Sequence, residues 1–303
     1  MSIDVTIRNG QLIKKPLKLQ DLTLGKYACG SLDEYGRNTE KIKDGDIVIY
    51  DPEAIGRGIT VRAWSANVKH EVQLKVHNLA TRRDLELFFE VIKNIMHVWK
   101  VKSFEQEDME YTEADMEKTC SELRQFALKF MAGMDRMTQK SKSNYVTIYC
   151  AMLPIDADVQ LLKRFGKEEN EEGFVKYLHD LQSKDAYYAV PYIYECKHKE
   201  NAFFGNYTVT SETDTIFPIV AKSPFGFINR VTGKQLECDF FTVSLFSLKQ
   251  DRAVGRMSFD DFVRLAGVKN CPPFDKTHVL LKGLSEEKMM ELANSEHKDP
   301  LAD

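Results

Sequence analysis

The segment Gly56-Arg57-Gly58 is the part of this 303-residue chain that could most readily hold a small ligand. Successive backbone N–H groups in such a segment can form a nest for an anion, and the Arg57 guanidinium would add a positive charge beside it. The same glycines could instead form a bulged entry to a strand that begins at Ile59. We favour the bulge and keep a small-ligand site at Arg57 as the less favoured hypothesis.

The signatures of common metal, nucleotide and catalytic sites are absent. The chain lacks a Gly-x-x-x-x-Gly-Lys-Ser/Thr loop, a Gly-x-Gly-x-x-Gly turn, a Gly-x-Ser-x-Gly elbow and a His-Glu-x-x-His helix. Cys196-Lys197-His198 offers two of the four ligands that a structural zinc site needs. The acidic stretch from Glu105 to Glu117 could bind a divalent cation, but acidic residues are also expected where a helix begins. The sequence therefore predicts no metal and no cofactor.

An enzyme remains the alternative function. Its site would be assembled from scattered carboxylates and a histidine, which only the folded chain brings together. None of the seven histidines lies four residues from another, so no helical metal pair is expected.

Aromatic residues are concentrated between Tyr187 and Tyr207. Two adjacent aromatic residues in a strand point to opposite faces, so one of each pair is exposed unless both faces are covered. An exposed tyrosine and phenylalanine surface is typical of a protein interface. Tyr188 and Phe204, each one half of an adjacent pair, are the candidate binding residues, and packing in a core is the competing interpretation.

Composition excludes several classes of partner. The net charge is −4, from 42 basic and 46 acidic residues, so the basic excess of a nucleic-acid-binding protein is missing. The chain begins Met-Ser-Ile-Asp-Val without a signal peptide, and no apolar run approaches the roughly 18–20 residues of a membrane span. We therefore expect a cytoplasmic protein with six reduced cysteines, no nucleic-acid partner and no membrane contact. The oligomeric state is left open.

The elements expected in the first half are strands followed by helices. Asn9-Gly10 lies between residues 5–8 and 11–13 and predicts a tight hairpin of two strands. Three further strands are expected at residues 47–50, 59–64 and 72–76.

Two capped amphipathic helices should follow these strands. Thr81 and Asp84 form a capping box before an apolar stripe that includes Phe88. Thr112 and Asp115 open a second helix, whose stripe includes Phe126 and which should end at Gly133. We expect both phenylalanines to be buried.

The second half mixes runs of strands with short helices. One strand is expected over residues 187–195, helices over residues 170–182, 258–265 and 285–294, and a disordered tail over residues 295–303. This order predicts an α+β fold, with mixed and antiparallel sheets packed by amphipathic helices. We expect a β-rich N-terminal domain with two helices at residues 1–140 and an α+β domain at 141–303, divided in the polar stretch 138–144.

Two stretches also resemble a known family. The first is Gly56-Arg57-Gly58-Ile59 with the helix of residues 81–95, and the second is Phe204-Gly205-Asn206-Tyr207-Thr208-Val209 with Thr215-Ile216-Phe217-Pro218 and the turn Pro224-Phe225-Gly226. Over most of its length the chain resembles an uncharacterised bacterial family of about 300 residues, known only as a domain of unknown function.

The resemblance implies a function only in general terms. Such families are similar in style to the intracellular immunity proteins of bacterial toxin systems, which bind and block a partner. The resemblance assigns no functional residue. The leading hypothesis is a non-enzymatic intracellular bacterial protein that binds a protein partner.

Overall fold

A computed structural model describes residues 2–134, 144–196, 202–224, 227–228 and 233–301. The chain forms two compact units, Met1–Lys184 and Asp185–Asp303. The boundary expected near residue 140 lies outside the described residues and stays a prediction.

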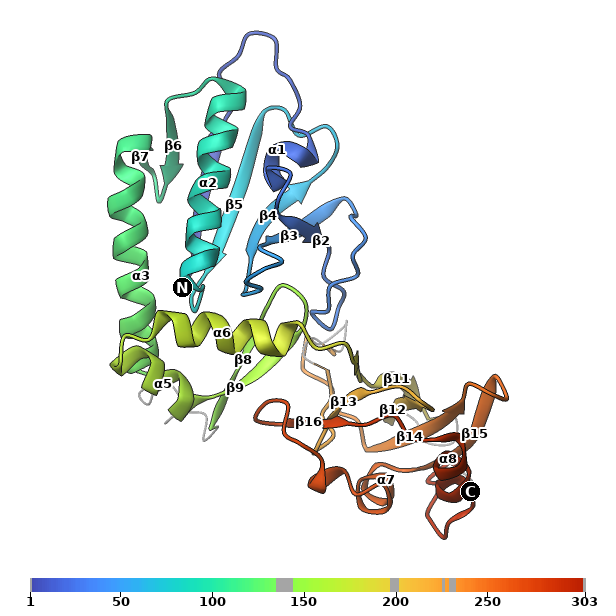
Figure 1. Ribbon diagram of the computed structural model, residues 1–303. Coiled ribbons are helices and arrows are strands. Elements are labelled where there is room, and N and C mark those ends of the chain that lie inside the picture. The colour runs from blue at the N-terminus through green and yellow to red at the C-terminus, as the bar shows by residue number, and fades with distance from the viewer. Residues whose placement is uncertain (1, 135–143, 197–201, 225–226, 229–232, 302–303) are drawn as a thin grey trace. The chain divides into compact units, whose positions relative to one another are not determined.

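The first unit contains a seven-stranded antiparallel sheet with the strand order β2-β3-β4-β5-β1-β6-β7 (Figure 1). Its strands are β1 (Ser2–Arg8), β2 (Ala28–Gly30), β3 (Gly45–Tyr50), β4 (Ile59–Trp64), β5 (Glu71–His77), β6 (Ser103–Gln106) and β7 (Met109–Thr112). The three strands expected at residues 47–50, 59–64 and 72–76 are confirmed as β3, β4 and β5.

The hairpin expected at Asn9-Gly10 is wrong. Strand β1 pairs with β5 and β6, and residues 11–13 form no strand, with Leu12 and Ile13 exposed. Asn9 is buried instead: its side chain donates to the Lys69 carbonyl at 2.9 Å and accepts from the Gln11 N–H at 3.0 Å. These hydrogen bonds direct the chain away from β1 without a tight turn. The tertiary contacts of Asn9 therefore override its local turn preference.

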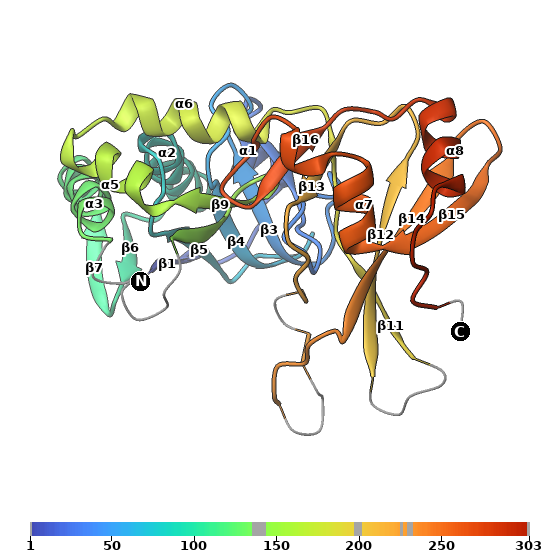
Figure 2. The ribbon, with the colours of Figure 1, turned by 90° about the horizontal axis from the view of Figure 1, so that it is seen from below.

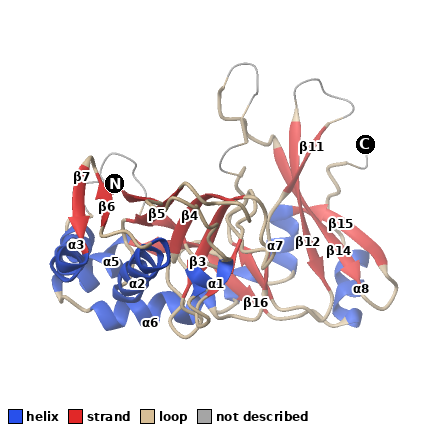
Figure 3. Ribbon diagram, turned by 90° about the horizontal axis from the view of Figure 1, so that it is seen from above, coloured by secondary structure: helices blue, strands red, loops and turns tan. Residues whose placement is uncertain are grey.

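Alternating side chains bury one face of this sheet. In β5, Val72, Leu74 and Val76 are buried while Glu71 and Gln73 are exposed. Helices α1 (Leu19–Thr23) and α2 (Arg82–Trp99) supply the other half of the core, and Figure 3 shows the helices of this unit on one side of its strands. Helix α2 begins at the predicted Thr81–Asp84 capping box, and Phe88 is fully buried.

In its described residues, the rest of the first unit combines a hairpin with three helices. These elements are the 3₁₀ turn η1 (Glu113–Asp115), α3 (Met116–Ala132), β8 (Tyr145–Tyr149), β9 (Pro154–Asp158), α5 (Val159–Lys167) and α6 (Glu171–Gln182). Helix α3 ends at Gly133 as predicted, whereas β9 and α5 were not anticipated. Helix α5 packs closely against α3 at Gly166. A Cβ at this position would lie 2.3 Å from the Ala132 nitrogen, so a larger residue would not fit.

The expected burial of Phe126 on α3 is wrong, since 42% of this residue is exposed. The buried face of α3 instead carries Met116, Ala127, Leu128 and Met131. The apolar stripe of α3 is wider than the surface with which its neighbours contact it. Phe126 lies at the margin of this stripe and therefore remains partly in solvent.

The described part of the second unit forms two mixed sheets. The four-stranded sheet has the order β11-β12-β14-β15, and the three-stranded sheet has the order β10-β13-β16. The strands are β10 (Tyr187–Tyr188), β11 (Tyr192–Glu195), β12 (Phe203–Thr210), β13 (Thr215–Pro218), β14 (Phe240–Ser247), β15 (Arg252–Ser258) and β16 (His278–Leu281). Strands β12 and β14 are parallel, as are β10 and β13, and the other pairs are antiparallel.

Helices cover one face of the four-stranded sheet (Figure 2). Phe262 of α7 (Phe259–Leu265) and Met289 of α8 (Glu286–Asn294) share a core with Val243 and Leu245 of β14. The 3₁₀ turn η2 (Val268–Asn270) follows α7. We call this helix-covered side the inner face and the opposite side the outer face.

Two expectations for this unit are corrected. The single strand expected over residues 187–195 is divided at Pro191 into β10 and β11, which belong to different sheets. The described part of the tail, residues 295–301, is held against β15 and is not disordered: Asp299 accepts two hydrogen bonds from Arg256 at 3.0 and 2.9 Å.

The α+β fold of mixed and antiparallel sheets packed by helices is confirmed. Within the described ranges, no helix has the length and apolar character needed to cross a membrane.

Candidate functional site

The Gly56-Arg57-Gly58 turn does hold an anion, which is the protein's own Asp84. The buried Asp84 carboxylate accepts hydrogen bonds from the backbone N–H groups of Arg57 at 3.0 Å, Gly58 at 2.7 Å and Thr81 at 2.8 Å, and from the Thr81 hydroxyl at 2.8 Å. A Cβ on Gly56 would lie 2.5 Å from a carboxylate oxygen of Asp84, and Gly58 has a φ of +69°. The two glycines therefore make room for the Asp84 carboxylate. The bulge expected at this turn is not found there, and the β3–β4 pairing is instead irregular between Gly45 and Ile47.

The Arg57 side chain is also bound within the protein. Its Nε donates to the Tyr149 carbonyl at 3.1 Å, and its Nη1 donates to the Asn78 carbonyl. Burial lowers the pKa of Arg57 from its ordinary value. Arg57 belongs to the first unit, whereas Tyr188 and Phe204 belong to the second and lie in different sheets.

His77, at the end of β5, should make the first unit sensitive to acid. Burial and the charge of Arg57 lower the pKa of His77 from 6.5 to about 4, so the folded chain keeps it neutral where the unfolded chain binds a proton. Stability is therefore lost as the pH falls from about 6.5 to about 4, by up to about 2 kcal/mol for this half-buried side chain. Urea unfolding at several pH values should show a smaller acid-induced loss for His77→Gln than for the wild type. The exposed control His70→Gln should keep the wild-type dependence, and an unchanged profile in His77→Gln would refute this assignment.

The expectation that Tyr188 is solvent-accessible is wrong. Only 9% of it is exposed, and its hydroxyl lies 3.2 Å from Nε2 of His278. Nδ1 of His278 lies 2.9 Å from the buried Asp275 carboxylate, which completes a chain of carboxylate, imidazole and hydroxyl. Such a chain could transfer protons, but His278 is also only 9% exposed, so a substrate has little access. We interpret the chain as a buried connection between β10 and β16.

Phe204 lies at the centre of a row of stacked rings on the outer face of the four-stranded sheet. Tyr194 of β11, Phe204 of β12 and Phe240 of β14 occupy paired positions on three neighbouring strands. The ring centroids of Tyr194 and Phe204 are 5.3 Å apart, and those of Phe204 and Phe240 are 5.4 Å apart with nearly parallel planes. We call these three residues the aromatic row.

Uncharged polar groups continue the outer face beside the aromatic row. The Asn206 Oδ1 accepts hydrogen bonds from the hydroxyls of Thr242 at 2.8 Å and Ser244 at 3.0 Å, which fixes the amide across β12 and β14. Tyr192 lies two residues before Tyr194 on the same face, and these tyrosines are 47% and 49% exposed. The outer face thus combines half-exposed tyrosines with fixed hydroxyl and amide groups.

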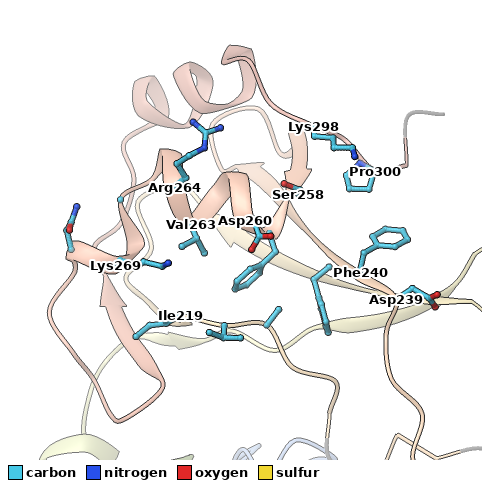
Figure 4. A pocket seen from close by; sticks show the side chains of 16 residues that line it. Ile219, Asp239, Phe240, Ser258, Asp260, Val263, Arg264, Lys269, Lys298 and Pro300 are labelled. Carbon is cyan, nitrogen blue, oxygen red and sulfur yellow. The ribbon is translucent and has the colours of Figure 1, made fainter.

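A hollow of about 1260 Å³ adjoins Phe240 (Figure 4). Apolar side chains of Ile219, Val263 and Phe240 line it, together with charged side chains of Asp260 and Lys269. Val263 of α7 belongs to the core of the inner face, so this hollow lies on that side of the sheet, and its mixed charges specify no single ligand.

The sequence placed Tyr192 and Tyr194 in the aromatic region, but Tyr188 and Phe204 were the candidates drawn from it. Tyr192 and Tyr194 could have been added, since residues two apart in a strand share a face. Phe240 could not, because it lies 36 residues after Phe204 and only the parallel pairing of β12 with β14 brings the two together.

Comparison with known proteins identifies a family without a described activity. No curated protein and no solved structure matches the chain. Residues 2–292 match a family described as a domain of unknown function, DUF4299. Since this match spans nearly the whole chain, the protein belongs to the DUF4299 family.

Proposed function

We propose that this chain is a non-enzymatic, cytoplasmic bacterial protein that binds a protein partner through the outer face of its four-stranded sheet. The observation that carries the proposal is the aromatic row, which ends in the half-exposed Tyr194. Blocking of the bound partner, as immunity proteins do, would be one consequence of such binding.

The chemistry of the outer face supports this proposal. Protein interfaces are enriched in tyrosine and phenylalanine and depleted of charged residues at their centre. Tyr194, Phe204, Asn206 and Ser244 form an uncharged area across three strands, with the fully buried Thr242 beneath it. Tyrosine buries a large area on binding at a small cost in conformational entropy, while hydroxyl and amide groups provide adaptable hydrogen bonds.

Charged groups lie around this area. Arg256, which pairs with Ser244 on the neighbouring strand β15, is held by Asp299 in a two-bond ion pair. An uncharged centre with a charged pair at its margin is the arrangement expected of a surface that a partner desolvates.

Tyr194→Ser should weaken partner capture without unfolding the protein. A half-exposed aromatic residue contributes little to folding but can be a binding hot spot, so we expect at least about a tenfold loss of affinity. The control is Tyr187→Ser, which removes another exposed tyrosine, from β10 in the other sheet. Both variants should keep their melting temperature within about 2 °C of the wild type.

The measurement is quantitative affinity capture from a lysate of the source organism, followed by calorimetry with the purified partner. The proposal fails if Tyr194→Ser captures the partner as well as Tyr187→Ser does. It also fails if both variants lose capture to the same extent.

A further inference from the structure

Strand β11 is the edge strand of the four-stranded sheet. Two residues of β11 direct their backbone N–H and C=O groups away from the neighbouring strand β12. The Cys196 N–H donates to the Ala202 carbonyl at 2.8 Å, just beyond the last pair of the β11–β12 ladder. In an antiparallel pair the residues bonded to the neighbour alternate with residues whose N–H and C=O groups face outward. Counting back from Cys196, Tyr194 and Tyr192 are bonded to β12, whereas Ile193 and Glu195 face outward.

The other side of β12 supports this assignment. The Asp239 N–H donates to the Phe203 carbonyl at 2.7 Å, and the Phe203 N–H donates to the Asp239 carboxylate at 3.1 Å. Phe203, which pairs with Glu195, therefore directs both backbone groups away from β11. Among the described residues, no hydrogen bond is seen to the backbone groups of Ile193 or Glu195.

We propose that the protein partner contributes an extended segment that pairs with β11 as a fifth, antiparallel strand. This inference rests on the proposed function and names the mode of binding. Unpaired N–H and C=O groups along a strand edge are matched by another strand, which returns one donor and one acceptor at each position. In antiparallel pairing, Ile193 and Glu195 would each exchange both bonds with the residue opposite, giving four hydrogen bonds from a short segment.

The side chains of β11 specify the chemistry of that segment. The residue opposite Tyr194 would lie in a pair without hydrogen bonds on the new side, where side chains come closest. An aromatic or β-branched residue there would extend the aromatic row by one position. The residue opposite the exposed Glu195 should be basic, and the residue opposite Ile193 should be apolar. Pro191 lacks an N–H, which ends the donor row at Ile193.

The first test uses a displayed library of random heptapeptides as the probe, with the full-length protein as bait. Selected peptides should share a basic residue followed directly by an aromatic or β-branched one. The variant Ile193→Pro removes an outward N–H that the β12 ladder does not use, and should weaken binding of a selected peptide at least about tenfold. Its control, Ile193→Val, keeps the N–H and should bind as the wild type does.

The second test leaves the protein unchanged, in case proline at position 193 disturbs the fold. A synthetic selected peptide is N-methylated at single positions and titrated against the wild type. Methylation of amides that face β11 should abolish binding, whereas methylation of the alternate amides should not. Equal effects at all positions, or failure to select any peptide, would overturn the proposal.

The outcomes separate this inference from the proposed function. If Tyr194→Ser loses the natural partner while Ile193→Pro retains it, the outer face binds in another mode and strand addition is refuted. If neither variant loses the partner, both proposals fall. Sedimentation that shows a wild-type dimer dissociated by Ile193→Pro would assign the edge to a second copy of this chain and would also refute strand addition by a partner.

Discussion

Replacing Asp84 by alanine should lower the free energy of unfolding of the first unit by about 3–5 kcal/mol, because it leaves several buried donors unpaired. The backbone N–H groups of Arg57, Gly58 and Thr81 all bond this carboxylate, and water has little access to replace it. The two tryptophans of the chain, Trp64 and Trp99, both lie in the first unit. Urea unfolding followed by tryptophan fluorescence therefore reports on the unit that the change affects.

The chain provides a matched control in its second capping box. Asp115 accepts hydrogen bonds from the Thr112 N–H and hydroxyl, both at 2.8 Å, but it lies in solvent. Asp115→Ala should cost much less stability, because water can bond the donors that it exposes. Equal losses in the two variants would show that Asp84 is a helix cap and nothing more.

Phe88→Ala should also destabilise the first unit, by about 3–5 kcal/mol, because it removes a fully buried ring from the centre of the core. Phe126→Ala should cost less than about 1 kcal/mol, since 42% of Phe126 is exposed and its removal leaves a smaller cavity. Both residues lie on helices of the same unit, so one fluorescence experiment compares them directly. A large loss in Phe126→Ala, or a small one in Phe88→Ala, would contradict the packing described here.

The elements with strong local signals could be predicted from the sequence. Strands β3, β4 and β5, the capping box of α2 and the glycine end of α3 are formed by residues close to one another along the chain. Alternation, helical spacing and capping depend on the conformation of a few consecutive residues, so they can be recognised without knowledge of the fold. The general α+β class and the family resemblance rest on the same signals.

The sequence predictions that proved wrong concern segments in which contacts with distant residues oppose the local conformational preference. Asn9-Gly10 forms no hairpin because Asn9 bonds Lys69, sixty residues away. Residues 187–195 read as one strand, but β10 and β11 pair with different strands on either side of Pro191. The apolar stripe of α3 is broader than the face that its neighbours cover, so Phe126 remains exposed.

The candidate sites show the same division between sequence and structure. The sequence by itself determined which residues could bind an anion or a partner: Arg57 between two glycines, and aromatic residues on strands. Only the tertiary structure decided that Asp84 fills the glycine turn, that Tyr188 is buried against His278, and that Phe204 is half-buried between two other rings. The physical reason is that residue type and spacing set local conformation, whereas burial and pairing depend on contacts that form when segments far apart in the chain pack together.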